Sequence, residues 1–257
     1  IAYNLKLLGG EPLIMATVGG DFGSYRAWLE RHGIDQRHIR ELPDTLCAQA
    51  YITTDLDDNQ ITAFHPGAMN HAHLNQVPAA AGLKLGMISP DGRDGMLEHA
   101  EQFHAAGVPF IFDPGQGLPM FGGEELRRFI ELASWVAVND YESRLLSERT
   151  GWNEAELARH VDAFIVTRGA QGSTIWANGE CITIPAVKPA AVLDPTGCGD
   201  AYRAGLLFGL SRGLGWEETG RIAALLGAIK IAHRGTQNHQ FSPVSLAQEF
   251  RAAFGHA

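Results

Sequence analysis

Short apolar runs alternate along the chain with segments of helical periodicity. The apolar runs typical of buried strands are LIMATVG (13–19), LKLGMIS (83–89), PFIFD (109–113), WVAVN (135–139) and AFIVTRG (163–169). Each run is followed by a helical pattern or a glycine turn, for example the helices expected over 22–33 and 91–106. This alternation predicts an α/β fold with a mostly parallel central sheet and helices on both of its faces.

Two segments depart from that alternation. Residues 172–185 have the pattern of a hairpin around Asn178 and Gly179, which predicts an antiparallel margin of the sheet. Residues 47–69 hold two alternating strands around an acidic turn. We interpret 45–66 as part of a small β lid, although the pattern alone fits an edge hairpin without function equally well.

The first residues already follow a helical pattern. Ile1, Leu5 and Leu8 share one face, and Gly9 and Gly10 end the run. We expect that an N-terminal strand of the sheet is missing from this sequence. The α/β core is then assigned to 1–44 and 67–257, with the lid between these two ranges.

Composition narrows the class of protein. Of the 257 residues, 45% are hydrophobic and 19% are charged, as in ordinary soluble globular proteins. The net charge of −9 argues against binding to nucleic acid, which requires clustered Lys and Arg. The apolar runs are too short to span a membrane, and three scattered cysteines favour a cytoplasmic location over a disulfide-stabilised secreted protein.

Polar residues follow several of the predicted strands. Asp113, Asn139, Thr167 and Asp194 stand at strand ends or just before a glycine turn. Ligands of doubly wound sheets bind at the carboxyl ends of the strands, so these residues indicate a site on that edge.

Asn139 and Glu142 lie three residues apart at a strand-to-helix junction. This spacing is typical of a helix N-cap with an acidic residue in the first turn. It also suits an amide and a carboxylate that orient Mg²⁺ through its waters beside a nucleotide. Both interpretations stay open on the sequence.

The stretch LDPTGCGDAYRAG (193–205) carries a glycine turn in front of a helix. Free N–H groups and the positive end of the helix dipole form an anion site there. Asp200 in the first turn is placed either as a helix cap or as a general base. Ala201, Gly205, Gly209 and Gly213 repeat every four residues, which predicts close approach to a neighbouring helix or to a bound nucleotide.

These motifs resemble the ribokinase-like (PfkB) carbohydrate and nucleoside kinases. DPTGCGDAYRAG is similar to that family's C-terminal motif, and it departs from the usual pattern at Pro195, Cys198 and Tyr202. VNDYE resembles the N-x-x-E motif, and VTRGAQGS resembles the nucleotide loop. The resemblance extends over essentially the whole chain and implies a ribokinase-like fold.

The resemblance also implies roles for single residues. Asp200 would be the general base, and the backbone amides of Gly197, Cys198 and Gly199 would form the anion hole. Asn139 and Glu142 would serve Mg²⁺ and the phosphates. Thr167, Gly169 and Gly172 would line the ATP loop. The implied cofactors are ATP and Mg²⁺, with a monovalent cation such as K⁺ near Asp194 in parts of the family.

The acceptor is less constrained than the phosphoryl donor. DLDDNQITAFHPGAM, DPGQG and RGTQNHQFS resemble prokaryotic adenosine or nucleoside kinases, so the 5′-hydroxyl of adenosine is the first expectation. Asn59, Gln60 and Phe64 are then candidate contacts to the nucleoside, although Phe64 also fits an inward-packing lid residue. The alternatives are a ribokinase- or fructokinase-type sugar kinase and a non-catalytic binding protein of the same fold. The chain is expected to act as a monomer or homodimer on a small molecule.

Overall fold

The computed structural model describes residues 1–54, 60–78 and 82–255 of the chain, and its strands in these ranges form three sheets. The largest has the order β10-β9-β8-β7-β6-β5, in which β5 to β8 are parallel and β9 and β10 are antiparallel. Its strands are β5 (Gly86–Ile88), β6 (Phe110–Phe112), β7 (Trp135–Asn139), β8 (Ala163–Thr167), β9 (Ser173–Ala177) and β10 (Glu180–Ile184). The mostly parallel sheet with an antiparallel margin is therefore confirmed.

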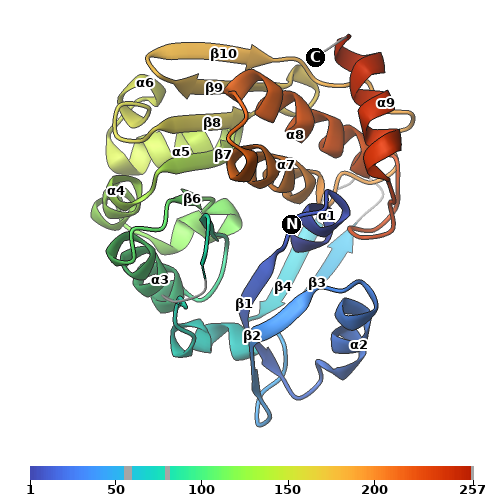
Figure 1. The fold of residues 1–257 in the computed structure, drawn as a ribbon. Helices are drawn as coiled ribbons and strands as arrows, with labels where there is room; N and C mark the ends of the chain where they lie inside the picture. Colours follow the sequence, from blue (N-terminus) through green and yellow to red (C-terminus); the bar gives the residue numbers. More distant parts are fainter. Residues whose placement is uncertain (55–59, 79–81, 256–257) are drawn as a thin grey trace.

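Alternation along β8 explains why helices cover both faces of this sheet (Figure 1). Phe164 and Val166 point into one apolar cluster, and Ala163 and Ile165 point into another. The first cluster includes α3 (Arg93–Ala105), α4 (Gly123–Leu132) and α5 (Asp140–Thr150), and the second includes α7 (Cys198–Arg212) and α8 (Trp216–Ile231). A strand buried on both faces is continuously apolar, as the sequence indicated.

A separate parallel pair is formed by β1 (Leu13–Gly19) and β2 (Asp35–Leu42). The strand β1 coincides with the run expected at 13–19. The sequence did not reveal β2, because DQRHIREL is mostly polar and only half-buried. These strands pack with α1 (Ala2–Leu7) and α2 (Gly23–Arg31) around the buried side chains of Tyr3 and Leu29.

The third sheet is the hairpin of β3 (Gln49–Thr54) and β4 (Gln60–His65), which confirms the small antiparallel sheet (Figure 1). Its base is closely packed against the core. A Cβ added to Gly19 or Gly67 would overlap the backbone of Leu46, and Ala68 N donates to Leu46 O at 2.9 Å. The hairpin is thus anchored where it leaves the core.

The glycines of α7 serve contact with α8. A Cβ at Gly205 would overlap the backbone of Ala223, and one at Gly209 would overlap the side chain of Thr219. Of the two explanations for the small-residue stripe, the neighbouring helix is therefore the right one, and Gly213 ends the helix with a φ of 69°.

The remaining elements connect and cover this core. They are α6 (Glu154–Leu157), α9 (Pro243–Phe254) and the 3₁₀ segments η1 (Gly67–Leu74), η2 (Gly115–Met120) and η3 (Gly169–Gln171). Among the helices of the described ranges, none has the length and apolar character that crossing a bilayer requires.

Candidate active site

The carboxyl ends of the central strands bring the predicted polar residues together. Asn139 and Thr167 are direct partners in the register of β7 and β8, and Thr167 Oγ1 donates to Val138 O at 3.4 Å. Asp113 follows β6, whose parallel neighbour is β7. The sheet therefore places these three residues on one edge, as expected for a ligand site of this fold class.

The glycine turn enters α7 next to that edge. Gly197 is the N-cap with a φ of 84°, a left-handed conformation that favours glycine. A Cβ at Gly197 would also lie 3.1 Å from Thr236 Cγ2, so the turn packs closely against the 234–237 segment. Asp200 occupies the first turn of α7 and is exposed, which leaves its carboxylate free to meet a substrate.

Two amides of the turn are open to an anion. Cys198 N donates to Pro195 O at 3.1 Å, so this amide of the expected anion hole is engaged within the turn. Among the described residues, Gly197 N and Gly199 N have no hydrogen-bond acceptor. These two N–H groups, together with the positive end of the helix dipole, can bind an anion at the start of α7.

Asn139 and Glu142 form a reciprocal capping box. Glu142 N donates to Asn139 Oδ1, and Asn139 N donates to Glu142 Oε2, both at 2.7 Å. The N-cap interpretation is therefore confirmed at the level of structure. It does not exclude the other interpretation, because each side chain keeps a second polar atom outside the box.

Arg203 of α7 connects that helix to this edge of the sheet through contacts that lie far apart in the sequence. Its Nη2 donates to Asp113 Oδ1 at 2.9 Å and to Ala137 O at 3.2 Å, and lies 3.9 Å from Glu142 Oε2. Its side chain is 6% exposed. Burial raises the pKa of Asp113 and of Glu142, and the Arg203 guanidinium opposes the rise in both.

These residues fit Mg²⁺ bound mainly through water and phosphate. In the described ranges, no group of three or more His, Cys, Asp or Glu side chains is arranged to cage a metal. Mg²⁺ in phosphoryl-transfer sites commonly uses one or two carboxylates and retains several waters. Glu142, with Asn139 beside it, offers such a sparse set.

The expected ATP loop follows β8. Gly169 has a φ of 55° and begins η3, and nothing lies within 4 Å of where its Cβ would be. Gly172 has a φ of 85°, and a Cβ there would overlap Ile184 O. Gly172 is thus required by the loop's own packing on the end of β10, whereas Gly169 leaves an open surface beside Thr167.

The candidate nucleoside contacts lie in the hairpin. Asn59 falls outside the described residues. Gln60 begins β4 as the register partner of Thr54. Phe64 is 53% exposed, so it is not the inward-packing residue that the sequence allowed as an alternative. The roles of these three residues stay predictions, as do those of the phosphoryl-transfer residues.

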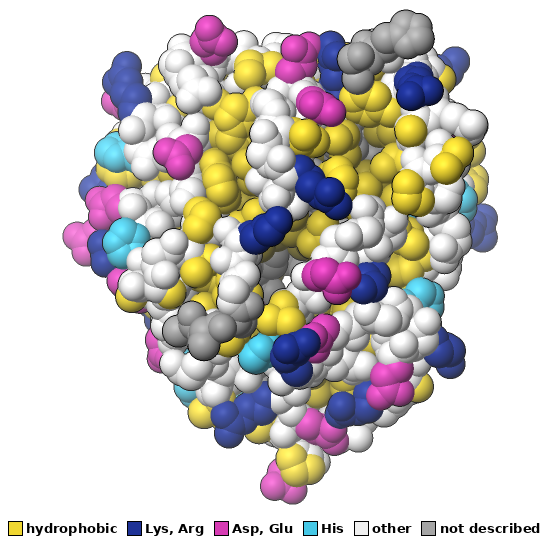
Figure 2. All heavy atoms as spheres, viewed as in Figure 1, with side chains coloured by type: hydrophobic (Ala, Val, Ile, Leu, Met, Phe, Trp, Pro, Cys, Tyr) yellow, Lys and Arg dark blue, Asp and Glu magenta, His cyan; other side chains and the backbone are white. Residues whose placement is uncertain are grey.

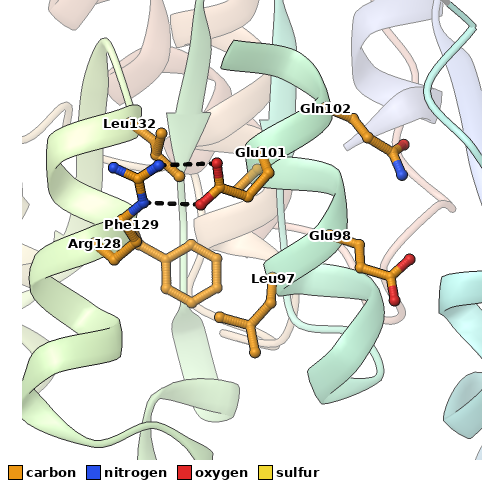
Figure 3. Close-up of a pocket in the computed structure, with 8 residues that line it drawn as sticks. Leu97, Glu98, Glu101, Gln102, Arg128, Phe129 and Leu132 are labelled. Atoms are coloured by element: carbon orange, nitrogen blue, oxygen red, sulfur yellow. Dashed lines mark hydrogen bonds and ion pairs between the residues drawn. The ribbon is translucent and has the colours of Figure 1, made fainter. Parts of the chain in front are cut away.

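Neither of two hollows in the described structure is lined by Asp200 or by the polar residues that follow β6, β7 and β8. One, of about 350 Å³, runs between α3 and α4, where Arg128 and Glu101 form a two-point ion pair across an apolar floor (Figure 3). It lies on the sheet face opposite α7. The other, of about 560 Å³, is at the base of the hairpin beside Leu46 and His65.

Charged side chains of both signs are interspersed on the face that carries α7 and α8 (Figure 2). Lys and Arg side chains do not gather into a broad basic patch among the described residues of that face.

Comparison with known proteins shows which family this chain resembles in sequence and in fold. The model of the pfkB family carbohydrate kinases matches residues 1–242. The Methanocaldococcus jannaschii nucleoside kinase is 32% identical over 241 residues, which cover 93% of this chain and 79% of that protein. The nucleoside kinase of Burkholderia thailandensis in complex with inosine is 51% identical with a TM-score of 0.96, over 99% of this chain and 84% of that one. The structure of the same Burkholderia thailandensis enzyme in complex with ADP-inosine has a TM-score of 0.95, and the match covers 99% of this chain and 80% of that one.

Proposed function

The chain belongs to the pfkB family of carbohydrate kinases, and we propose that it is a nucleoside kinase that transfers the γ-phosphoryl group of MgATP to the 5′-hydroxyl of a purine nucleoside. The observation that carries this proposal is the exposed Asp200 beside the open amides of Gly197 and Gly199. Adenosine, expected from the sequence, and inosine, which the 51% identical Burkholderia thailandensis enzyme binds, are the two candidate acceptors.

The proposed reaction is an in-line displacement at phosphorus. The oxygen of the acceptor hydroxyl attacks the γ-phosphorus, and the Asp200 carboxylate takes the proton from that hydroxyl. The Gly197 and Gly199 N–H groups stabilise the charge on the transferred group. The oxygen that bridges to the β-phosphate leaves with the electrons of the broken bond, and ADP is released. Glu142 and Asn139 would hold Mg²⁺ through its waters, and the bound ion would neutralise charge on the phosphates.

The hairpin of β3 and β4 is proposed to be a lid over the acceptor. Its base is fixed by Gly19 and Gly67 against Leu46, while Phe64 and Ile52 present exposed apolar side chains on one face of the hairpin. Closure of that face onto a nucleoside would cover these two side chains and exclude water, which limits wasteful hydrolysis of ATP.

The experiment is an acceptor panel with purified protein and MgATP. Adenosine, inosine, cytidine, ribose and fructose are compared at equal concentration, and the products are identified by mass spectrometry. We expect a nucleoside 5′-monophosphate from adenosine or inosine at the highest kcat/KM. If a free sugar were phosphorylated and none of the nucleosides were, the proposal would be wrong and the protein would be a sugar kinase.

A further inference from the structure

Lys230 is a buried lysine whose charge is not part of the proposed chemistry. It lies in the last turn of α8, and its side chain is 0% exposed. Lysine is almost never fully buried unless its ammonium is paired, because removing the charge from water is costly. The contacts of the ammonium therefore indicate why it is there.

Oxygen atoms surround this ammonium. Lys230 Nζ donates to Asp194 O at 2.7 Å and to His233 O at 3.1 Å, and Asp194 Oδ2 lies 4.0 Å away. Backbone carbonyls and a carboxylate are also the ligands that alkali cations take in proteins. The resemblance to the PfkB family indicated K⁺ beside Asp194 as an optional cofactor. The residues do not fit an added cation there, because their oxygens already bind Nζ.

Asp194 transmits this contact to the glycine turn. Its Oδ1 accepts from Thr196 N at 2.9 Å, and its Oδ2 accepts from Gly235 N at 2.8 Å. These two backbone donors lower the pKa of Asp194 to about 2, and Lys230 adds to the effect, so the carboxylate is ionised at neutral pH. Asp194 N also donates to Ile231 O at 3.2 Å. The entry to the turn is thus tied to the end of α8 on several sides.

We infer that the Lys230 ammonium replaces a bound monovalent cation in this enzyme, holding the Asp194 end of the glycine turn so that the site needs no added K⁺. Lys230 is a positioning residue: it acts on the Gly197 and Gly199 amides through Asp194. The Lys230 ammonium is part of the chain, so its charge is always present at the site. The occupancy of a site for a free cation would instead depend on the concentration of that cation. The inference about catalysis rests on the proposed kinase activity.

The test uses three proteins in KCl, NH₄Cl and tetramethylammonium chloride at equal ionic strength. Lys230→Ala removes the ammonium and leaves room for a cation between the oxygens. Lys230→Met removes the charge but fills the same space. Lys84→Ala removes an exposed lysine and is the control. Thermal unfolding and kinase rate are measured for each protein beside the wild type.

We expect the wild type and Lys84→Ala to show the same Tm and rate in all three salts. Lys230→Ala should lose at least ten-fold in rate in tetramethylammonium, and regain both Tm and most of the rate in K⁺ or NH₄⁺. Lys230→Met should stay impaired in every salt. The inference would be overturned if K⁺ raised the wild-type Tm by several degrees or the wild-type rate several-fold. It would also be overturned if Lys230→Ala had the same Tm and rate in all three salts.

The thermal measurement separates this inference from the proposed function. If the wild type phosphorylates none of the acceptors, the kinase proposal fails, while the salt dependence of Tm still decides whether Lys230 stands in for a cation. The Tm of the wild type in the three salts tests this point even if neither Lys230 variant folds.

Discussion

Arg203 Nη2 lies 2.9 Å from Asp113 Oδ1 in the buried region between α7 and the end of β6. This ion pair joins the helix that carries Asp200 to the strand end that precedes η2. Because Arg203 also donates to Ala137 O and approaches Glu142, one guanidinium connects the helix of the proposed base Asp200 with the proposed Mg²⁺ side of the site.

Replacing Arg203 should therefore cost stability as well as activity. Arg203→Met leaves the Asp113 carboxylate buried without its partner, and the free energy of unfolding should fall by about 3–5 kcal/mol. Urea unfolding followed by circular dichroism measures this. Arg144→Met, an exposed arginine on α5, is the matched control and should stay within about 0.5 kcal/mol of the wild type. If the free energy of unfolding fell equally in both variants, the ion pair between Arg203 and Asp113 would not be a specific source of stability.

Glu142 should control the requirement for Mg²⁺. Glu142→Gln keeps an oxygen to accept from Asn139 N, so α5 remains capped, but it removes the carboxylate charge. The rate at saturating ATP should fall about 10–100-fold, with more free Mg²⁺ needed for half-maximal rate. Initial rates across a Mg²⁺ titration measure both effects. Glu148→Gln on the exposed side of the same helix should leave the titration unchanged; an identical curve for Glu142→Gln would contradict the assignment.

His239 should make the fold sensitive to mild acid. Burial lowers the pKa of His239 to about 4, with the nearby His233 and Lys230 charges adding to the effect. The unfolded chain, with an ordinary histidine pKa near 6.5, binds the proton more readily between these values. Stability is therefore lost as the pH falls from about 6.5 to about 4, by about 3 kcal/mol in total.

The pH dependence of urea unfolding tests this. His239→Gln keeps a side-chain partner for Asn4 Oδ1, which His239 Nε2 contacts at 2.6 Å, and should flatten the curve between pH 6.5 and 4. His104→Gln, at an exposed position on α3, should leave the curve as in the wild type. If the free energy of unfolding of His239→Gln still fell between pH 6.5 and 4 as in the wild type, the acid sensitivity would come from other groups.

The sequence predicted the parts of the fold that local pattern controls. Continuous apolar runs identified β7 and β8 because both faces of these strands are buried. The same criterion missed β2, whose mostly polar, half-buried strand pairs with β1 in a separate two-stranded sheet. Asn178, with a φ of 53°, and Gly179, with a φ of 79°, form the hairpin turn that their residue types indicated.

Long-range pairs in the site could not be read from the sequence. Asp113 and Arg203 are 90 residues apart, and Lys230 and Asp194 are 36 apart, so no local period links them. One signal was present in the chain: Lys230 interrupts the apolar stretch AALLGAIKIA, and a single charge on a buried helical face requires a partner. The identity of that partner depends on the tertiary fold.

The central claim is that Asp200 is a general base and not only a first-turn acid that stabilises its helix. Asp200→Asn is compared with Asp94→Asn, which changes an exposed acid in the first turn of α3. The kinase rate with MgATP and inosine or adenosine is measured, together with ADP binding by calorimetry. The account predicts a loss of about 10²–10⁴-fold in rate for Asp200→Asn, with ADP binding retained, and a wild-type rate for Asp94→Asn. Equal turnover in the two variants would contradict it.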